Sequence, residues 1–361
     1  MKRVVGKLFL CFPLVLGMAA ANYKADPAHI FRASQYTRTV AQFLLKGSNV
    51  ANAGNYDGRL LQRHYVNGLS ERKDVIVLGS SRAMQVRASL FPGKSVFNSS
   101  ITQGSLRDYV AIYEMYAAKN LEPSMVVLRL DPWIFDRTNK RLDRLFTIDA
   151  EYQAGRQRLG LPAQPQTLSQ RLDGATRRYF QLFSPAYLQS SVAYLAKPRP
   201  LHETKLEQGN VVIKLSDGSL SYEKKRQAKQ AAAERRGHKF VQAPFGKIDP
   251  EAVAELEAFV DYLQKRKIEV VFLLAPYRPS QYKSMLADDD FRNLTEVEAR
   301  LKSIASTRHI EIVGSYDPVK MGCSESDYFD PTHPNTACVA RLFREHVSRY
   351  ERENGMPSVL K

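Results

Sequence analysis

Cysteine is scarce in this sequence, with three among 361 residues, and clusters with metal-ligand spacing are missing altogether. The sequence therefore predicts neither a metal site nor another cofactor. It also lacks zinc-finger spacing, an RNA-binding aromatic signature and a basic zipper, so nucleic acid is not an expected partner. The net charge of +16 favours an anionic partner such as a phospholipid surface or an acidic polysaccharide. The alternative is a basic surface with no special partner.

The one long apolar run is short for a comfortable membrane span. It covers residues 8–21, LFLCFPLVLGMAAA, and follows the basic residues Lys2, Arg3 and Lys7. This order is typical of a secretory signal peptide, and residues 19–21 offer a small-residue cleavage site. An uncleaved anchor in the inner membrane and a buried first helix are the alternatives. We expect the body of the chain to be exported, to the periplasm or the outer face of the inner membrane.

Export changes the interpretation of the cysteines. Cys11 lies inside the apolar run, which leaves Cys323 and Cys338 in the exported part. Two cysteines in an oxidising compartment are a candidate disulfide, although they can also be two unrelated buried thiols. A bridge would close a small loop around residues 324–337, SESDYFDPTHPNTA.

Strands and helices alternate along most of the chain. Apolar runs of strand length cover residues 74–80, 95–100, 125–133, 269–277 and 310–316. Helical spacing of apolar residues covers 57–71, 105–120, 250–267, 294–307 and 335–353. This alternation predicts an α/β fold with a doubly wound, mainly parallel five-stranded sheet. Polar residues that follow the strands should meet at the carboxyl edge of such a sheet.

The expected organisation has six segments. They are a signal peptide or anchor (1–21), an N-terminal arm and helix (22–70), the first half of the sheet domain (71–136), a helical insertion between strands three and four (137–248), the second half (249–354) and a tail (355–361). Within the insertion, residues 222–239 are strongly basic and helix-prone. We interpret them as a solvated helix face, with binding of anionic lipid or glycan as the alternative.

Two adjacent serines, Ser80 and Ser81, follow the first strand in VIVLGSSRAM. A serine hydroxyl becomes a good nucleophile only when a base, an acid that orients the base and oxyanion donors surround it. Among the seven histidines, His333 alone lies on a late loop close to an acid, with Asp330 three residues before it in YFDPTHPNTA. We expect these two residues to be the base and the acid. Alternatively, the serines only cap the following helix, and the other two are ordinary loop residues.

The ordered set of Gly-Ser-Ser after the first strand, Gly104 after the second and Asp-Pro-Thr-His near the C-terminus resembles the SGNH/GDSL hydrolase superfamily. The resemblance implies that Ser81 is the nucleophile, with His333 as base and Asp330 as acid. It also implies that the backbone N–H groups of Ser81 and Gly104 hold the oxyanion. The resemblance implies an SGNH-like sheet domain.

One position departs from the family pattern. The third block of the family usually ends in Gly-x-Asn, whose side chain donates to the oxyanion, whereas this chain has Asp131 in VVLRLDPW. A carboxylate cannot donate a hydrogen bond unless it is protonated. Either another donor such as Arg82 substitutes, or Asp131 serves the structure or orients the substrate. The resemblance covers about residues 70–135 and 250–350 and leaves out the insertion.

Four features narrow the resemblance to one branch: GSSR, the DPW after the third strand, APYRP after the fourth and the N-terminal targeting segment. This branch contains exported proteins that work with membrane-bound O-acyltransferases, as in teichoic-acid D-alanylation and alginate O-acetylation. It implies a serine esterase or O-acyltransferase that acts on acetyl-like esters of a cell-envelope polysaccharide. The alternative is a non-catalytic glycan-binding protein or membrane-acyltransferase partner with an idle triad.

Overall fold

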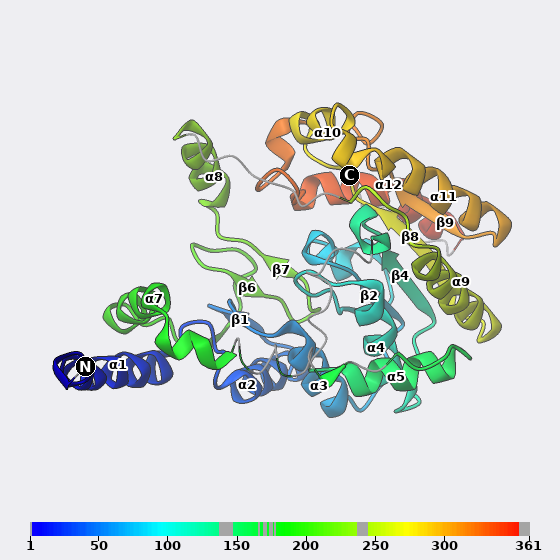
Figure 1. Cartoon of the computed structure of the whole chain (residues 1–361). Coiled ribbons are helices and arrows are strands. Elements are labelled where there is room, and N and C mark those ends of the chain that lie inside the picture. Colours follow the sequence, from blue (N-terminus) through cyan, green and yellow to red (C-terminus); the bar gives the residue numbers. More distant parts are fainter. Residues whose placement is uncertain are drawn as a thin grey trace.

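A parallel five-stranded sheet forms the centre of the molecule (Figure 1). The structure is a computed structural model that describes residues 2–136, 147–164, 167–168, 172, 176, 178–236 and 245–353. The strand order is β3-β2-β4-β8-β9, and every neighbouring pair is parallel. The strands are β2 (Val75–Leu78), β3 (Val96–Asn98), β4 (Met125–Arg129), β8 (Glu269–Leu274) and β9 (Glu311–Gly314). The predicted α/β fold and its five-stranded sheet are therefore confirmed.

Helices cover both faces of this sheet, as in a doubly wound fold. Alternate residues of each strand enter different cores because side chains along a strand point to opposite faces. Ile76 and Leu78 belong to the core that contains α3 (Gly58–Gly68), α4 (Leu106–Ala117), α9 (Pro250–Lys265) and α11 (Asn293–Thr307). Val75 and Val77 belong to the core that contains α12 (Thr336–Glu353). The continuous apolar runs of the sequence reflect this burial on both faces.

The predicted insertion and the N-terminal arm share a second sheet. Its four short strands have the order β5-β1-β6-β7 and pair antiparallel. They are β1 (Asn49–Ala51), β5 (His202–Thr204), β6 (Ile213–Lys214) and β7 (Leu220–Ser221). The described part of the insertion also contains α5 (Asp149–Arg158), α7 (Pro185–Ala196) and α8 (Arg226–Arg235). It is thus not only helical, and β1 of the arm lies between its strands.

Several expected segments fall partly or wholly outside the described residues. These are the start of the insertion (137–146), the end of the basic run (237–239) and the tail (355–361). Two further helices are α2 (Ala33–Leu45) in the arm and α10 (Pro279–Leu286) after β8. The start of α10 is polar and the helix is short, so the sequence did not mark it off from the neighbouring loop.

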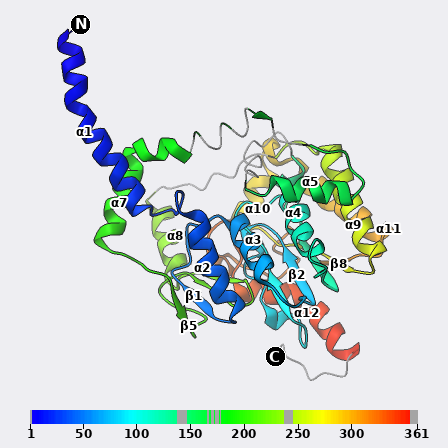
Figure 2. The same ribbon diagram turned by 90° about the horizontal axis from the view of Figure 1, so that it is seen from below.

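The N-terminal run is part of a single helix, α1 (Lys2–Ala25), which continues through residues 19–21. Figure 2 shows α1 projecting from the rest of the molecule, with α7 beside the half that is nearer the sheets. Within the described ranges, no helix combines the length and hydropathy needed to cross a membrane. The signal peptide and the anchor both stay predictions.

A disulfide joins Cys323 and Cys338, which confirms the predicted pair. It connects the loop after β9 to the first turns of α12 and closes the segment that carries Asp330 and His333. The chain between the two cysteines is short, with a sequence separation of 15 residues.

Replacing both cysteines with serine is expected to lower the free energy of unfolding by about 3 kcal/mol, because the unfolded chain regains the freedom that a loop of this length loses. Urea denaturation of the variant and of the oxidised protein measures the difference. The reduced wild-type protein is the control and should match the variant. Equal unfolding midpoints for the variant and the oxidised protein would contradict the expected role of the bridge.

Candidate active site

Strand β2 ends in a turn that only glycine fits. A Cβ on Gly79 would lie 2.6 Å from the Cβ of Ala83 and 2.8 Å from the Cβ of Arg129. The chain then enters the short helix η1 (Ser81–Ala83), and Ser80 caps it by accepting a hydrogen bond from the amide of Arg82 at 3.2 Å. This turn places Ser81 at the carboxyl edge of the sheet, where ligands bind in open α/β folds.

The loop before α12 builds the Asp330–His333 pair locally. The Asp330 carboxylate accepts hydrogen bonds from the amides of Thr332 at 3.1 Å and of His333 at 3.0 Å. At the base of the loop, the amide of Phe329 donates to the carbonyl of His333 at 2.9 Å. Such a turn, in which an aspartate side chain binds the following amides, is a property of the local sequence. It brings the imidazole back onto the carboxylate three residues earlier.

The structure brings the three predicted catalytic residues together, although Ser81 and His333 are 252 positions apart. Ser81 Oγ lies 2.8 Å from His333 Nε2. His333 Nδ1 lies 2.7 Å from Asp330 Oδ1 and 2.9 Å from Oδ2. In this geometry the carboxylate holds the proton on Nδ1, and Nε2 is free to accept the serine proton.

The Asp330 carboxyl group stays ionised. Burial alone would raise its pKa, but the hydrogen bond and charge of His333, followed by those of Arg226, outweigh burial and hold the pKa well below its usual value. An ionised carboxylate at this place can orient the imidazole and stabilise the imidazolium that forms when Ser81 gives up its proton.

Arg82 uses its donors inside the protein, which speaks against the alternative in which it donates to the oxyanion. Its side chain is buried, and its donors contact the carbonyls of Thr332, Ala275 and Pro276 at 2.8 to 2.9 Å. Its guanidinium carbon lies 3.8 Å from the ring centroid of Tyr277. Arg82 thus connects the end of β2 to the end of β8 and to the histidine loop.

Asp131 is likewise buried, and it serves the structure rather than the substrate. Its carboxylate accepts hydrogen bonds from Ser80 Oγ at 2.6 Å and from the guanidinium groups of Arg82 and Arg129, each at 2.7 Å. Both arginines are buried as well. Of the two alternatives for Asp131, the structural one agrees with these contacts.

Gly104 packs against the serine turn but does not offer its amide. A Cβ here would lie 2.5 Å from the carbonyl oxygen of Gly79, so glycine is required for the close approach. Its N–H donates to the carbonyl of Ile101 at 3.1 Å. This bond corrects the expectation that the Gly104 amide is free for an oxyanion. The Ser81 amide is better placed, since it begins η1 and the first N–H groups of a helix have no partner inside it.

Residues of the insertion that no sequence pattern singled out lie against the triad. Arg226 Nη2 donates to Asp330 Oδ2 at 2.7 Å, and its guanidinium carbon lies 3.9 Å from the ring centroid of Tyr222. The Tyr222 ring stands edge-on to the His333 ring, with centroids 6.1 Å apart. Gln227 Nε2 donates to the carbonyl of Tyr328 at 2.9 Å.

The start of the basic run is largely solvated, as predicted, but Arg226 and Gln227 also contact the histidine loop. Helix α8 has no buried residue of its own and meets the histidine loop through polar side chains alone. An apolar stripe, the usual mark of a packed helix in a sequence, is absent here. The one available hint was the aromatic residue Tyr222 at the beginning of the basic run.

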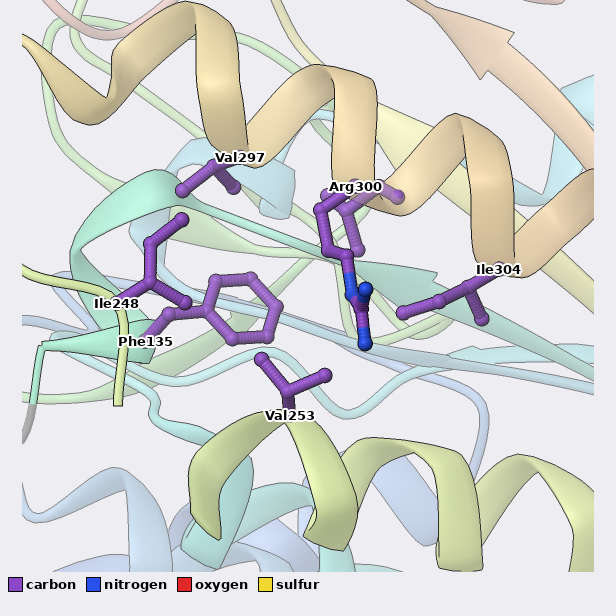
Figure 3. A pocket seen from close by; sticks show the side chains of 7 residues that line it. Phe135, Ile248, Val253, Val297, Arg300 and Ile304 are labelled. Atoms are coloured by element: carbon purple, nitrogen blue, oxygen red, sulfur yellow. The ribbon is translucent and has the colours of Figure 1, made fainter. Parts of the chain in front are cut away.

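A hollow elsewhere in the molecule does not belong to this site. Figure 3 shows it between α9 and α11. Its lining is apolar apart from one arginine and consists of Phe135, Ile248, Val253, Val297, Arg300, Leu301 and Ile304. No triad residue lines it. Across the part of the chain that the structure describes, no group of three or more His, Cys, Asp or Glu side chains could hold a metal ion.

No family model matches this chain, and a comparison with curated proteins finds no match either, so its function has to be argued from the geometry of this site.

Proposed function

We propose that this protein is an exported serine esterase or O-acyltransferase that acts on acetyl-like esters of a cell-envelope polysaccharide. One observation carries the catalytic part of the proposal: Ser81, His333 and Asp330 form an unbroken chain of hydrogen bonds. This arrangement has the nucleophile, the base and the orienting acid that acyl transfer through a serine requires.

The geometry fits a two-step reaction. His333 Nε2 takes the proton of Ser81 as Oγ attacks the ester carbonyl, and the Ser81 N–H faces the oxygen that becomes negative. The imidazolium, stabilised by Asp330, then gives its proton to the leaving alcohol, and the acyl group stays on Ser81. In the second step, water or a sugar hydroxyl loses its proton to His333 and attacks the acyl carbonyl; the bond to Ser81 Oγ then breaks, and Oγ takes the proton back from His333. Water gives an esterase, and a sugar hydroxyl gives an O-acyltransferase.

The resemblance and the N-terminal sequence support three further parts of the proposal. These are a polysaccharide substrate, export, and a membrane-bound O-acyltransferase as partner. GSSR, DPW and APYRP are the residues that support this branch. The basic composition is compatible with an acidic polymer.

A second candidate is a non-catalytic glycan-binding or acyltransferase-binding protein with an idle triad. The engaged amide of Gly104 favours it, because that group would otherwise be the second oxyanion donor. The carboxylate of Asp131 at the place of the family asparagine favours it too, since an ionised carboxylate does not donate.

Turnover of an aryl acetate separates the two candidates. The folded full chain should release the aryl alcohol repeatedly, whereas the same protein unfolded in denaturant shows only the background reaction of its surface amines. An oligosaccharide acceptor added to the assay then divides esterase from transferase, because only a transferase yields an acetylated sugar. Equal rates for folded and unfolded protein would favour the idle triad.

Arg226 should be a positioning residue for the triad. Its replacement by alanine removes a charge-assisted hydrogen bond to Asp330, which is expected to lower kcat about tenfold with little change in KM. Arg226→Lys should restore part of the loss. Lys229→Ala is the matched control, because Lys229 lies on the same helix and pairs with Glu223 instead. A variant without Arg226 that keeps the full kcat would contradict this role.

A further inference from the structure

Exposed apolar side chains are concentrated in two segments of the chain. All but three of the large ones that the structure describes lie on α1 or between residues 168 and 195. They are Phe12, Leu14, Val15, Leu16, Tyr23, Leu168, Leu172, Tyr179, Phe180, Phe183, Val192 and Leu195. Soluble surfaces do carry single exposed apolar residues, but a concentration of this size marks a contact surface.

Helix α7 is attached to α1 by polar side chains. Asn22 Nδ2 donates to the carbonyl of Leu182 at 2.9 Å, and Asn22 Oδ1 accepts from Ser191 Oγ at the same distance. Tyr187 donates to Asp26 Oδ1 at 2.8 Å. The buried seam is thus polar while the outer surface is apolar, which inverts the pattern of a helix pair that faces water.

We call the side chains of Tyr179, Phe180, Phe183, Val192 and Leu195 the apolar collar. The collar lies next to α1, because α7 and η5 (Gln181–Phe183) contact that helix (Figure 2). A surface that binds the apolar run of α1 is therefore also close enough to contact the collar.

We propose that the apolar collar rests on the headgroup layer of an anionic phospholipid membrane, as a second membrane contact beside α1. Three observations point to lipid. The collar lies on elements that contact α1, and α1 exposes apolar side chains of its own. It contains a tyrosine, which is enriched at the membrane–water interface, and two phenylalanines, which are typical of the apolar face of interfacial segments. Exposed cations flank it, namely Lys24, Lys197 and Arg199, and these attract anionic headgroups.

A second copy of the chain fits this surface less well than lipid does. In a two-fold symmetric dimer the same patch would face itself. Lys24, Lys197 and Arg199 of the two copies would then come together, and like charges at close range repel one another. Anionic lipid, in contrast, pairs with all of these cations at once.

Site-specific fluorescence tests the contact in the full chain. Cys11→Ser gives a background in which the other two cysteines are held in the disulfide. Single cysteines at Phe180 or Leu195 are then labelled with an environment-sensitive dye. Leu286→Cys is the matched control, because Leu286 is 53% exposed against 51% for Leu195 and lies on α10. The vesicles contain phosphatidylglycerol and phosphatidylethanolamine, with or without brominated acyl chains.

Bromolipid vesicles should quench the dyes at 180 and 195 and leave the dye at 286 bright. Two outcomes would overturn the proposal. One is the absence of quenching at 180 and 195, whether the protein binds the vesicles or not. The other is a blue shift without bromolipid quenching, which would place the collar against protein. Neither outcome depends on whether Ser81 is catalytic, so this test is separate from that of the proposed function.

Discussion

Replacing Ser81 with alanine should lower kcat for an aryl acetate by more than about a thousandfold. The reason is that the variant lacks the hydroxyl that lies 2.8 Å from His333 Nε2, and no acyl-enzyme can form without it. The remaining rate should come from the polar surroundings and from background hydrolysis. Steady-state release of the aryl alcohol measures the effect.

Ser80→Ala is the control for this prediction, because the two serines are adjacent and differ in their partners. Ser80 Oγ is buried and donates to Asp131, away from His333. Its replacement should keep the triad and most of the turnover, at some cost in stability. If Ser80→Ala stops turnover and Ser81→Ala keeps it, the assignment of the nucleophile is wrong.

Replacing Asp131 with alanine should lower the free energy of unfolding by about 3 to 5 kcal/mol, the usual cost of leaving buried charges without a partner. Both Arg82 and Arg129 would lose their carboxylate while remaining inside the protein. Asp131→Asn keeps the shape but removes the charge, and it should also destabilise the fold. Chemical denaturation followed by circular dichroism measures the change.

The matched control for Asp131 is an exposed ion pair. Lys229 and Glu223 form one at 2.8 Å, and Lys229→Ala should change the free energy of unfolding by less than about 1 kcal/mol. An Asp131→Ala variant that is no less stable than Lys229→Ala would contradict the structural role of the buried network.

The buried network also sets a pH dependence. Burial by itself would raise the pKa of the Asp131 carboxyl, but the charges of Arg129 and Arg82 outweigh it and lower the pKa below its ordinary value of 3.8. A lowered pKa in the folded state means that the contribution to stability is complete above about pH 4 and is lost as the pH falls through the lowered value. This acid sensitivity should be weaker in Asp131→Asn, which has no carboxyl group to protonate at this position.

The sequence was sufficient to predict the central sheet and the meeting of the triad. Runs such as VIVL and VVFLL are buried on both faces, so they show neither polar gaps nor helical spacing. The Asp330–His333 pair is set by a local turn, and the topology of a parallel sheet brings its loop to Ser81. These features depend on short-range patterns or on general rules of topology.

Other features depend on long-range pairing that no local pattern carries. Strands β6 and β7 have two residues each, and β6 joins the sheet by pairing with β1, more than 150 positions away. The contact of Arg226 with Asp330 joins residues 104 positions apart, and its helix lacks an apolar stripe. The amide of Gly104 is engaged because of the turn that begins at Ile101, and a glycine in the sequence does not show where its N–H points.

The most direct test of the central claim is the site of fluorophosphonate labelling. This reagent forms a covalent adduct with a serine only when a neighbouring base activates the hydroxyl. Peptide mass mapping of the labelled full chain should place one adduct on Ser81, and His333→Ala should remove it. An unlabelled wild-type protein, an adduct on a different serine, or full labelling of His333→Ala would contradict the account.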